Sequence, residues 1–248
     1  MGSRFITQYS AKSRFELCEL PNRPIDRTTQ ALCAPMRKST IVSSFLALTV
    51  CCGGTAGSHA AGPSLDSAYT EYDFERCPHR AGRDAEDYGE WRCKGLNGIT
   101  VRASAGDQRM TMSFGPRAGN EPAAAQTLRG FNSIDRGRIE WRLAREGRRR
   151  SRPFAAIVRW STFAVDERQS AEEATKGKVL VVTRLGPGGV CHVGYVDALA
   201  NANANDLARN IADERARSFR CDADKPVIVG ATGPGFSSSD GAMRGDSP

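Results

Sequence analysis

The sequence predicts an α+β domain that consists mainly of antiparallel sheet, with one C-terminal helix packed on the sheet and disulfides stapling the fold. Three observations lead to this prediction. Several segments alternate apolar and polar residues, residues 204–219 have helical periodicity, and four cysteines remain after an expected leader. The chain has 248 residues, 40% hydrophobic and 25% charged, and this ordinary globular composition excludes fibrous and wholly disordered proteins.

The N-terminal region has the residue order of a secretory signal peptide at 36–60. A basic pair precedes an apolar stretch that begins at Ile41, and small residues follow as far as Ala60. The stretch is shorter than the roughly 20 residues that span a bilayer as a helix. We expect cleavage after Ala60, no transmembrane anchor after processing, and residues 1–35 to be a non-native upstream extension or disordered. Lipid attachment at Cys51 is the less favoured alternative, because the residue before this cysteine is bulky.

More than half of the net charge of +7 lies before Ala61, in the segment expected to be removed and the residues upstream of it. From Ala61 onward there are 28 basic and 25 acidic residues, so the remaining chain carries only +3. Of these 28 bases, 24 are arginine, a bias that genome composition alone produces, so it does not indicate phosphate binding. No stretch interleaves basic and aromatic residues, and nucleic acid is therefore not an expected partner.

The four remaining cysteines form an even set in an expected oxidising compartment. Three pairings are possible, and the favoured one closes two short local loops. It joins Cys77 with Cys93 and Cys191 with Cys221. The alternative is a metal site, since His79 and His192 each lie near a cysteine, but no C-x-x-C pair occurs. We expect no metal and no cofactor.

Alternating and continuous apolar patterns predict a series of strands. Period-two alternation indicates those at 99–103, 110–114 and 138–144, the partner of the last is expected at 154–163, and apolar runs indicate those at 179–185 and 190–196. The first two form a hairpin with one buried face. In the third, one set of side chains is expected to face inward (Ile139, Trp141, Leu143) and the other to face outward (Arg138, Glu140, Arg142). The last two are nearly all apolar, which is typical of central strands covered on both faces.

The predicted helix follows at 204–219, where an alanine-rich apolar stripe recurs at helical spacing. Asn203 and Asp206 suit the cap and the third position. The opposite face carries residues at i,i+4 spacing, namely Arg209, Asp213 and Arg217. A further short helix at 167–175 and a last strand at 225–230 are possible. The single α+β domain is expected to cover 65–230, and the Gly-, Ser- and Pro-rich residues 231–248 to form a disordered tail.

No catalytic signature is present in the sequence. There is no G-x-S-x-G, H-E-x-x-H or G-x-x-x-x-G-K-[ST] motif, and residues 186–189 are interpreted as a hairpin turn. Alternation places His192 on the sheet face opposite Val193 and Tyr195, where a sheet histidine with its hydrogen bonds satisfied is expected. The chain is therefore more simply interpreted as a protein without enzymatic activity.

The first candidate site is the segment between Cys77 and Cys93. It is a disulfide-closed polar loop with aromatic residues, which favours a recognition surface over a catalytic one. Its candidate residues are His79, Asp84, Glu86, Tyr88 and Trp91. A solvated acidic loop is the simpler alternative. An envelope hydrolase that uses carboxylates such as Asp84, Glu86 or Glu90 is the alternative function.

The second candidate site is a cluster of arginines in the turn between two predicted strands. Residues 129–152 contain nine basic and three acidic residues. The expected anion-binding residues are Arg148, Arg149, Arg150 and Arg152, with anionic lipid or glycan of the envelope as counterpart. The alternative is a solvated hairpin loop.

The segment from Cys191 to Ala198, the Asn-rich start of the helix and Cys221 together resemble a pattern of uncharacterised exported bacterial proteins. The resemblance extends over about Tyr69 to Gly230 and implies secretion, with no assigned activity. The sequence therefore predicts a secreted or periplasmic binding or accessory protein of the cell envelope.

Overall fold

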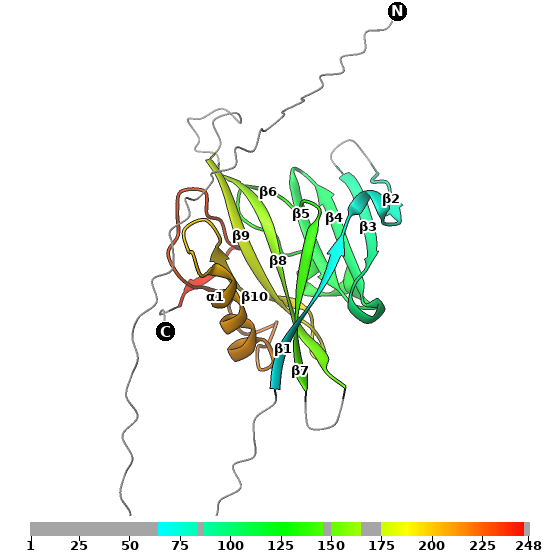
Figure 1. Ribbon diagram of the computed structural model, residues 1–248. Coiled ribbons are helices and arrows are strands. Elements are labelled where there is room, and N and C mark those ends of the chain that lie inside the picture. The colour runs from blue at the N-terminus through cyan, green and yellow to red at the C-terminus, as the bar shows by residue number, and fades with distance from the viewer. Residues whose placement is uncertain (1–63, 84–86, 146–149, 165–174, 246–248) are drawn as a thin grey trace, which may run out of the picture. The chain divides into compact units, whose positions relative to one another are not determined.

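In the computed structural model, two β-sheets pack face to face, and one helix covers the far side of the larger sheet (Figure 1). The structure describes residues 64–83, 87–145, 150–164 and 175–245. The larger sheet has the order β1-β7-β8-β9-β10-β11-β12, with β6 also paired to β8; the smaller has the order β2-β3-β4-β5. The predicted class, α+β with mainly antiparallel strands, is confirmed.

The strand bounds of the larger sheet are β1 (Ser64–Tyr72), β6 (Phe131–Ser133), β7 (Gly137–Arg145), β8 (Arg152–Ala164), β9 (Thr175–Arg184), β10 (Cys191–Asp197), β11 (Val227–Ile228) and β12 (Met243–Arg244). The smaller sheet contains β2 (His79–Arg80), β3 (Asp87–Lys94), β4 (Thr100–Gly106) and β5 (Arg109–Phe114). The helical elements are α1 (Ala204–Ile211), a π-helical turn at Ala212–Ala216, and 3-10 turns at Phe74–Arg76, Leu96–Gly98, Ala118–Asn120 and Pro122–Ala124.

The long strand β8 organises the larger sheet. One edge of β8 pairs with β9 along ten residues, from Ala155 to Ala164. Its other edge pairs first with β7 and then with β6. The link between β6 and β7 therefore lies beside the middle of β8, which brings Asp135 and Arg136 next to the sheet.

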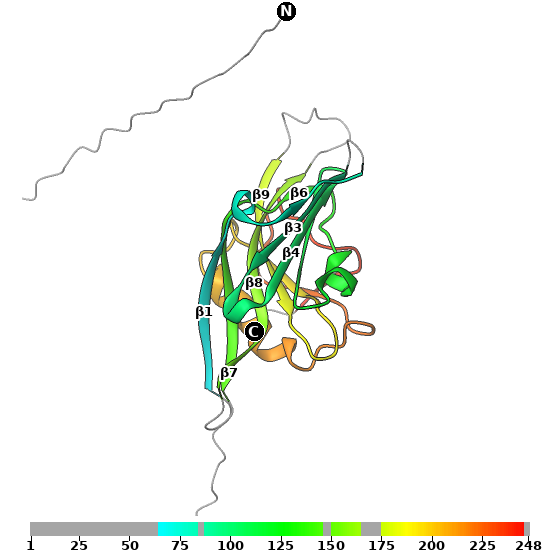
Figure 2. The same cartoon turned by 90° about the vertical axis from the view of Figure 1, so that its right-hand side faces the viewer.

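The main core lies between the two sheets, where strands β3 and β4 cross in front of β8 (Figure 2). Trp141 of β7 is fully buried there and meets Phe114 of β5 edge to face, with ring centroids 5.5 Å apart. Its indole nitrogen donates to the Thr70 hydroxyl at 2.9 Å. Trp141 thus joins the two sheets and satisfies its one polar group, as a buried tryptophan requires.

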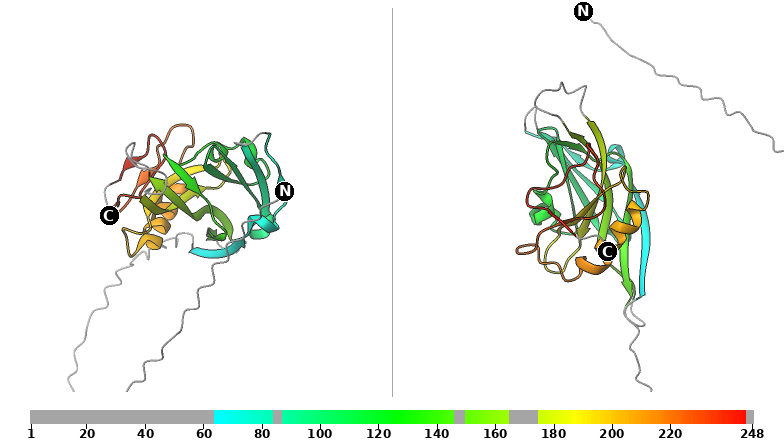
Figure 3. Two further views of the ribbon diagram at one scale, coloured as in Figure 1. Left: turned by 90° about the horizontal axis from the view of Figure 1, so that it is seen from above. Right: turned by 90° about the vertical axis from the view of Figure 1, so that its left-hand side faces the viewer.

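The second core lies between the larger sheet and the helix (Figure 3). The alanines Ala208, Ala212 and Ala216 are buried against the sheet, which allows the helix to approach closely. All seven residues of β10 are buried, which confirms a central strand covered on both faces. Asn203 is the N-cap residue, but its side chain makes no capping hydrogen bond.

The polar face of β7 does not face solvent as predicted. Glu140 and Arg142 are buried and contact the helix. Arg142 donates two hydrogen bonds to Asp213, at 2.8 and 2.6 Å, and Arg209 donates to Glu140 at 2.6 Å. The expected exposed row of helix charges is therefore wrong for Arg209 and Asp213. Their charged groups point to the sheet, where each meets an opposite charge.

The predicted orientation of His192 is correct relative to Val193, which packs in the second core, but wrong relative to Tyr195. A register shift between His192 and Gly194 in the pairing of β10 with β9 interrupts the alternation. As a result His192 and Tyr195 share the face toward the main core, and the histidine Nδ1 lies 2.9 Å from the Tyr195 hydroxyl. His192 is fully buried, and its Nε2 has no hydrogen-bond partner among the described residues.

Burial lowers the pKa of His192 to about 3. Below pH ~6.5 the unfolded chain takes up a proton at this residue, whereas the folded chain does not. We expect the free energy of unfolding to fall by about 1.4 kcal/mol per pH unit between pH ~6 and pH ~5 because of His192. Urea unfolding at these two pH values measures the slope, and His192→Gln should flatten it. Equal slopes in both proteins would show that His192 is protonated in the fold.

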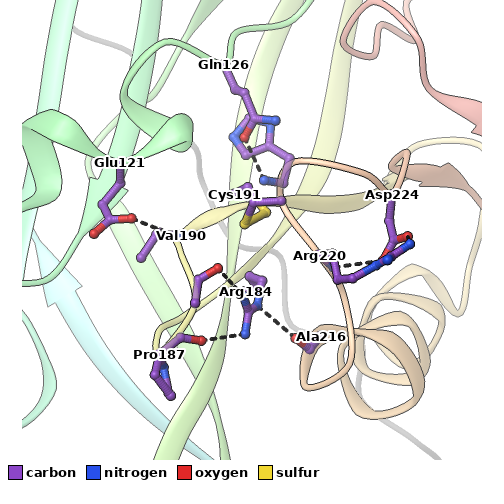
Figure 4. Close-up of a disulfide and its surroundings, with 12 residues drawn as sticks. Glu121, Gln126, Arg184, Pro187, Val190, Cys191, Ala216, Arg220 and Asp224 are labelled. Atoms are coloured by element: carbon purple, nitrogen blue, oxygen red, sulfur yellow. Dashed lines mark hydrogen bonds and ion pairs between the residues drawn. A yellow bond between two sulfur atoms is a disulfide. The ribbon is translucent and has the colours of Figure 1, made fainter.

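Both predicted disulfides are present, Cys77–Cys93 and Cys191–Cys221. The second ties the start of β10 to the segment after the helix (Figure 4). Beside it, Arg184 donates to the carbonyl oxygens of Ala216 at 3.1 Å and of Pro187 and Gly188, both at 2.7 Å. The helix end is therefore held by a covalent bond and by a guanidinium group.

The expected disordered tail is wrong for residues 231–245, which lie on the larger sheet. The Thr162 hydroxyl donates to the Gly235 carbonyl at 2.6 Å, and Asp197 accepts from the Gly233 amide at 2.7 Å. Strand β12 pairs in parallel with β11, which lies within the predicted last strand at 225–230. Low apolar content predicted disorder, but backbone hydrogen bonds anchor this segment instead. The expected leader, upstream extension and helix at 167–175 lie outside the described residues, the last apart from strand residue 175.

Candidate functional site

The described part of the candidate recognition loop contains β2 and nearly all of β3. Asp84 and Glu86 lie outside the described residues. The rings of His79 and Trp91 stack with centroids 4.7 Å apart. Tyr88 is 57% exposed, and its backbone carbonyl lies 3.1 Å from the His79 Nε2.

The aromatic residues of this loop belong to a row that extends from the main core. Tyr72 contacts Phe74, Phe74 contacts Trp91, and Trp91 stacks on His79. Trp91 pairs with Ala103, which is buried in the core, so the tryptophan points toward the inner face of its sheet. Packing therefore accounts for His79 and Trp91. The described candidate residues His79, Tyr88 and Trp91 are not among those that line the depression formed by other residues of this loop.

Glu90 lies on the outer face of the same sheet and is held by arginines. Arg92 donates to it at 2.7 Å and Arg102 at 2.6 Å, and Arg80 lies 3.7 Å away. Burial alone raises the pKa of Glu90, but the hydrogen bonds from Arg102 and Arg92 outweigh this and hold its pKa below the usual value. A general acid needs a raised pKa. Glu90 is therefore unsuited to the acid role that a carboxylate hydrolase requires.

The predicted arginine cluster lies only in part within the described residues. Arg148 and Arg149 are outside them, whereas Arg150 and Arg152 are described and exposed. These two lie where β8 begins, at the end of the strand far from Arg159. Seven residues of extended strand separate Arg152 from Arg159, a distance of roughly 23 Å at the usual rise per residue.

A depression lined by basic side chains lies on the helix side of the larger sheet, beside α1. We call it the basic groove. Its volume is about 570 Å³. Five cationic side chains line it (Arg136, Arg138, Arg159, Lys178, Arg209). Two carboxylates, two tyrosines and an amide line it as well (Asp135, Glu140, Tyr69, Tyr72, Asn205), above a floor of Ile157 and Leu180.

Two arginines line the basic groove from neighbouring strands, Arg138 from β7 and Arg159 from β8. The pairing of β7 with β8 ends at Glu140 and Ile157, and each arginine lies two residues beyond this pair, on the same face of its strand as Glu140 or Ile157. On its other side Arg159 faces Leu180. Like charges in one groove repel each other. An anion bound between the two guanidinium groups would relieve this repulsion.

Both carboxylates of the basic groove already have partners. Asp135 accepts from the Ser161 hydroxyl at 2.6 Å and from Lys178 at 3.4 Å. Glu140 accepts from Arg209 and, at 2.6 Å, from the Ser67 hydroxyl. Neither carboxylate is thus left to neutralise the two arginines of the neighbouring strands.

The hydrogen bond from Ser161 is the main cause that lowers the pKa of Asp135. Partial burial opposes the shift, and the charge of Lys178 adds to it. Asp135 therefore stays ionised near neutral pH and keeps its ion pair with Lys178.

The arginines at the centre of the basic groove have no such partner. Within the described structure, Arg136 and Arg159 form no hydrogen bond or ion pair, and both are exposed. Arg138 lies over the Tyr69 ring, 5.1 Å from its centroid, and forms no ion pair with Glu71, its cross-strand neighbour. The groove thus offers three guanidinium groups to an anion.

Sequence reasoning missed the basic groove although one signal was present. Arg159 interrupts a run of apolar residues in the strand predicted at 154–163. A lone arginine on an otherwise buried strand marks a place where the sheet is uncovered. Arg138 comes from another strand, so only the fold reveals that the two arginines line one groove.

No family model, curated protein or solved structure matches the chain. Among the described residues, no group of three or more His, Cys, Asp or Glu side chains is placed to hold a metal ion. The described helices include none with the length and apolar character needed to cross a membrane.

Proposed function

We propose that the chain is a secreted or periplasmic binding or accessory protein of the cell envelope, and that its basic groove binds an anionic ligand. The observation that carries the proposal is that Arg138 and Arg159 line the same groove, and that neither has a carboxylate partner in the described structure. An anion between the two guanidinium groups removes their repulsion and gains charge-assisted hydrogen bonds.

The expected signal peptide and the two disulfides support export. The expected signal peptide at 36–60 directs the chain out of the cytoplasm, and two disulfides persist where the compartment is oxidising. In the envelope, acidic glycans and anionic lipids are the abundant anions, so they are the partners that this charge favours.

A matched pair of double variants tests the proposal. Arg138→Gln/Arg159→Gln removes two charges from the basic groove, and Arg150→Gln/Arg152→Gln removes two from the hairpin arginines. Calorimetric titration with inorganic phosphate, trigalacturonic acid and phosphatidylglycerol vesicles compares three kinds of anion. We expect the groove variant to weaken binding of the preferred anion by about tenfold or more, the value of roughly one charge-assisted hydrogen bond.

The hairpin variant should stay within about twofold of the unmodified protein, a change smaller than one surface ion pair contributes. Asp135→Asn should strengthen binding, because it removes a negative charge and releases Lys178. Binding should also weaken as the screening length falls from about 30 Å at 0.01 M salt to about 3 Å at 1 M. If the groove variant binds every anion as well as the unmodified protein, the proposal is wrong.

A further inference from the structure

We infer that the ligand of the basic groove is an acidic saccharide, meaning a hydroxyl-rich sugar ring that carries a carboxylate. The inference rests on the proposed function and names its substrate class. It depends on the groove's other polar and aromatic groups, which a simple inorganic anion leaves unused.

The first argument comes from the hydrogen-bond acceptors beside the arginines. Asp135 and Glu140 line the same groove and carry negative charge, which repels an anion that brings no hydrogen-bond donors. The Glu140 Oε2 atom accepts only one bond, at 3.3 Å from Arg209. The Asp135 Oδ1 atom likewise accepts only one, from Ser133 at 3.2 Å. Each has a free lone pair, and sugar hydroxyls are donors that match it.

The second argument is the tyrosine at the wall of the groove. Tyr69 is 46% exposed although it is a large aromatic residue on a strand. Arg138 lies over its ring, and Arg209 donates to its hydroxyl at 3.3 Å. The ring is therefore held in place before a ligand arrives, which lowers the entropic cost of binding. Arg138 covers part of the ring, and the part left exposed offers the apolar C–H face of a sugar a surface to pack on.

The third argument separates a soluble saccharide from a lipid surface. The large hydrophobic residues exposed in the described structure are Tyr69, Tyr88, Leu199 and Met243, and of these only Tyr69 lines the groove. Binding to a bilayer requires a buried apolar area beside the basic groups. The rim of this groove does not supply one. A volume of about 570 Å³ is within the usual range for small-molecule sites.

The test uses the purified chain with both disulfides formed and four probes in calorimetric titration. The probes are trigalacturonic acid, the neutral trisaccharide maltotriose, inorganic phosphate and phosphatidylglycerol vesicles. We expect trigalacturonic acid to bind at least tenfold more tightly than any other probe. Such a ratio corresponds to about 1.4 kcal/mol.

Variants of Tyr69 test whether this residue contacts the saccharide. Tyr69→Ala should weaken binding of trigalacturonic acid by about fivefold or more, the range of one aromatic contact, and weaken phosphate binding clearly less. Tyr69→Phe keeps the ring and should stay within about twofold. Asn205 lines the groove from α1. Asn205→Ala should weaken binding of trigalacturonic acid without weakening binding of phosphate. Thermal unfolding verifies that each variant is folded.

The outcomes distinguish the inference from the function on which it rests. Equal affinity for phosphate and trigalacturonic acid, with no effect of Tyr69→Ala, overturns the inference of a saccharide ligand but not the proposal that the groove binds an anion. Binding of vesicles and of no other probe leads to the same conclusion. Maltotriose bound as tightly as trigalacturonic acid, with no effect of the double Arg138 and Arg159 variant, overturns both.

Discussion

Replacing Trp141 with alanine is expected to lower the free energy of unfolding by about 3–5 kcal/mol, the range for large buried aromatics. The side chain is fully buried between the two sheets, contacts Phe114, and donates its only polar hydrogen to Thr70. Alanine leaves a cavity at the point where the sheets meet and an unpaired acceptor on Thr70. Urea unfolding followed by far-UV circular dichroism measures the loss.

A more conservative substitution is the control for this prediction. Trp141→Phe keeps an aromatic ring in the core and should cost clearly less than Trp141→Ala. Gly95→Ala should also destabilise the fold, because its Cβ would stand 2.5 Å from an atom of the Trp141 ring. A loss below about 1 kcal/mol in Trp141→Ala, the level of a typical surface change, would contradict the packing of the two sheets on this residue.

Removing the Cys191–Cys221 disulfide is expected to cost about 3–4 kcal/mol in the chain-entropy model, since the bond closes a loop of 30 residues. The variant Cys191→Ser/Cys221→Ser frees the segment after the helix from β10. Arg184 still donates to the Ala216 carbonyl, so we expect the helix to stay docked near neutral pH while the unfolding midpoint drops.

The other disulfide is the matched comparison. Cys77→Ser/Cys93→Ser opens a loop of 16 residues and should cost roughly 3 kcal/mol, slightly less than the first pair. Denaturant unfolding of both double variants under identical conditions measures the difference. If removing Cys191–Cys221 changed the free energy of unfolding by less than removing Cys77–Cys93, chain entropy would not be the main origin of the stabilisation.

Local patterns in the sequence were enough to predict the class of fold. Period-two alternation predicts the hairpin of β4 and β5, and nearly continuous apolar runs predict the central strands β9 and β10; these are present. Cysteine spacing predicts both disulfides, because short local loops are the simplest to close. These features depend on residues close together in the chain.

Features that depend on distant residues could not be predicted in the same way. The helix charges Arg209 and Asp213 pair with strand β7, about 70 residues earlier, so no local spacing reveals them. The orientation of His192 depends on a bulge in the pairing with β9. Residues 231–245 are held by backbone hydrogen bonds, which composition does not record.

The candidate site shows the same division. Sequence reasoning expected a basic surface in the arginine-rich stretch 129–152, and two cations of the groove, Arg136 and Arg138, come from it. The other cations of the groove, Arg159, Lys178 and Arg209, come from β8, β9 and α1, and only the fold brings them together. The hairpin arginines and the basic groove are consequently two different surfaces.

Assigned NMR signals of the arginine Nε–Hε groups during titration with inorganic phosphate test the central claim most directly. Phosphate reports on the anion groove without depending on the saccharide. We predict saturable shifts at Arg138 and Arg159 that fit one dissociation constant, with small, non-saturating shifts at Arg150 and Arg152. Equal, non-saturating shifts at all four arginines would contradict an anion site in the basic groove.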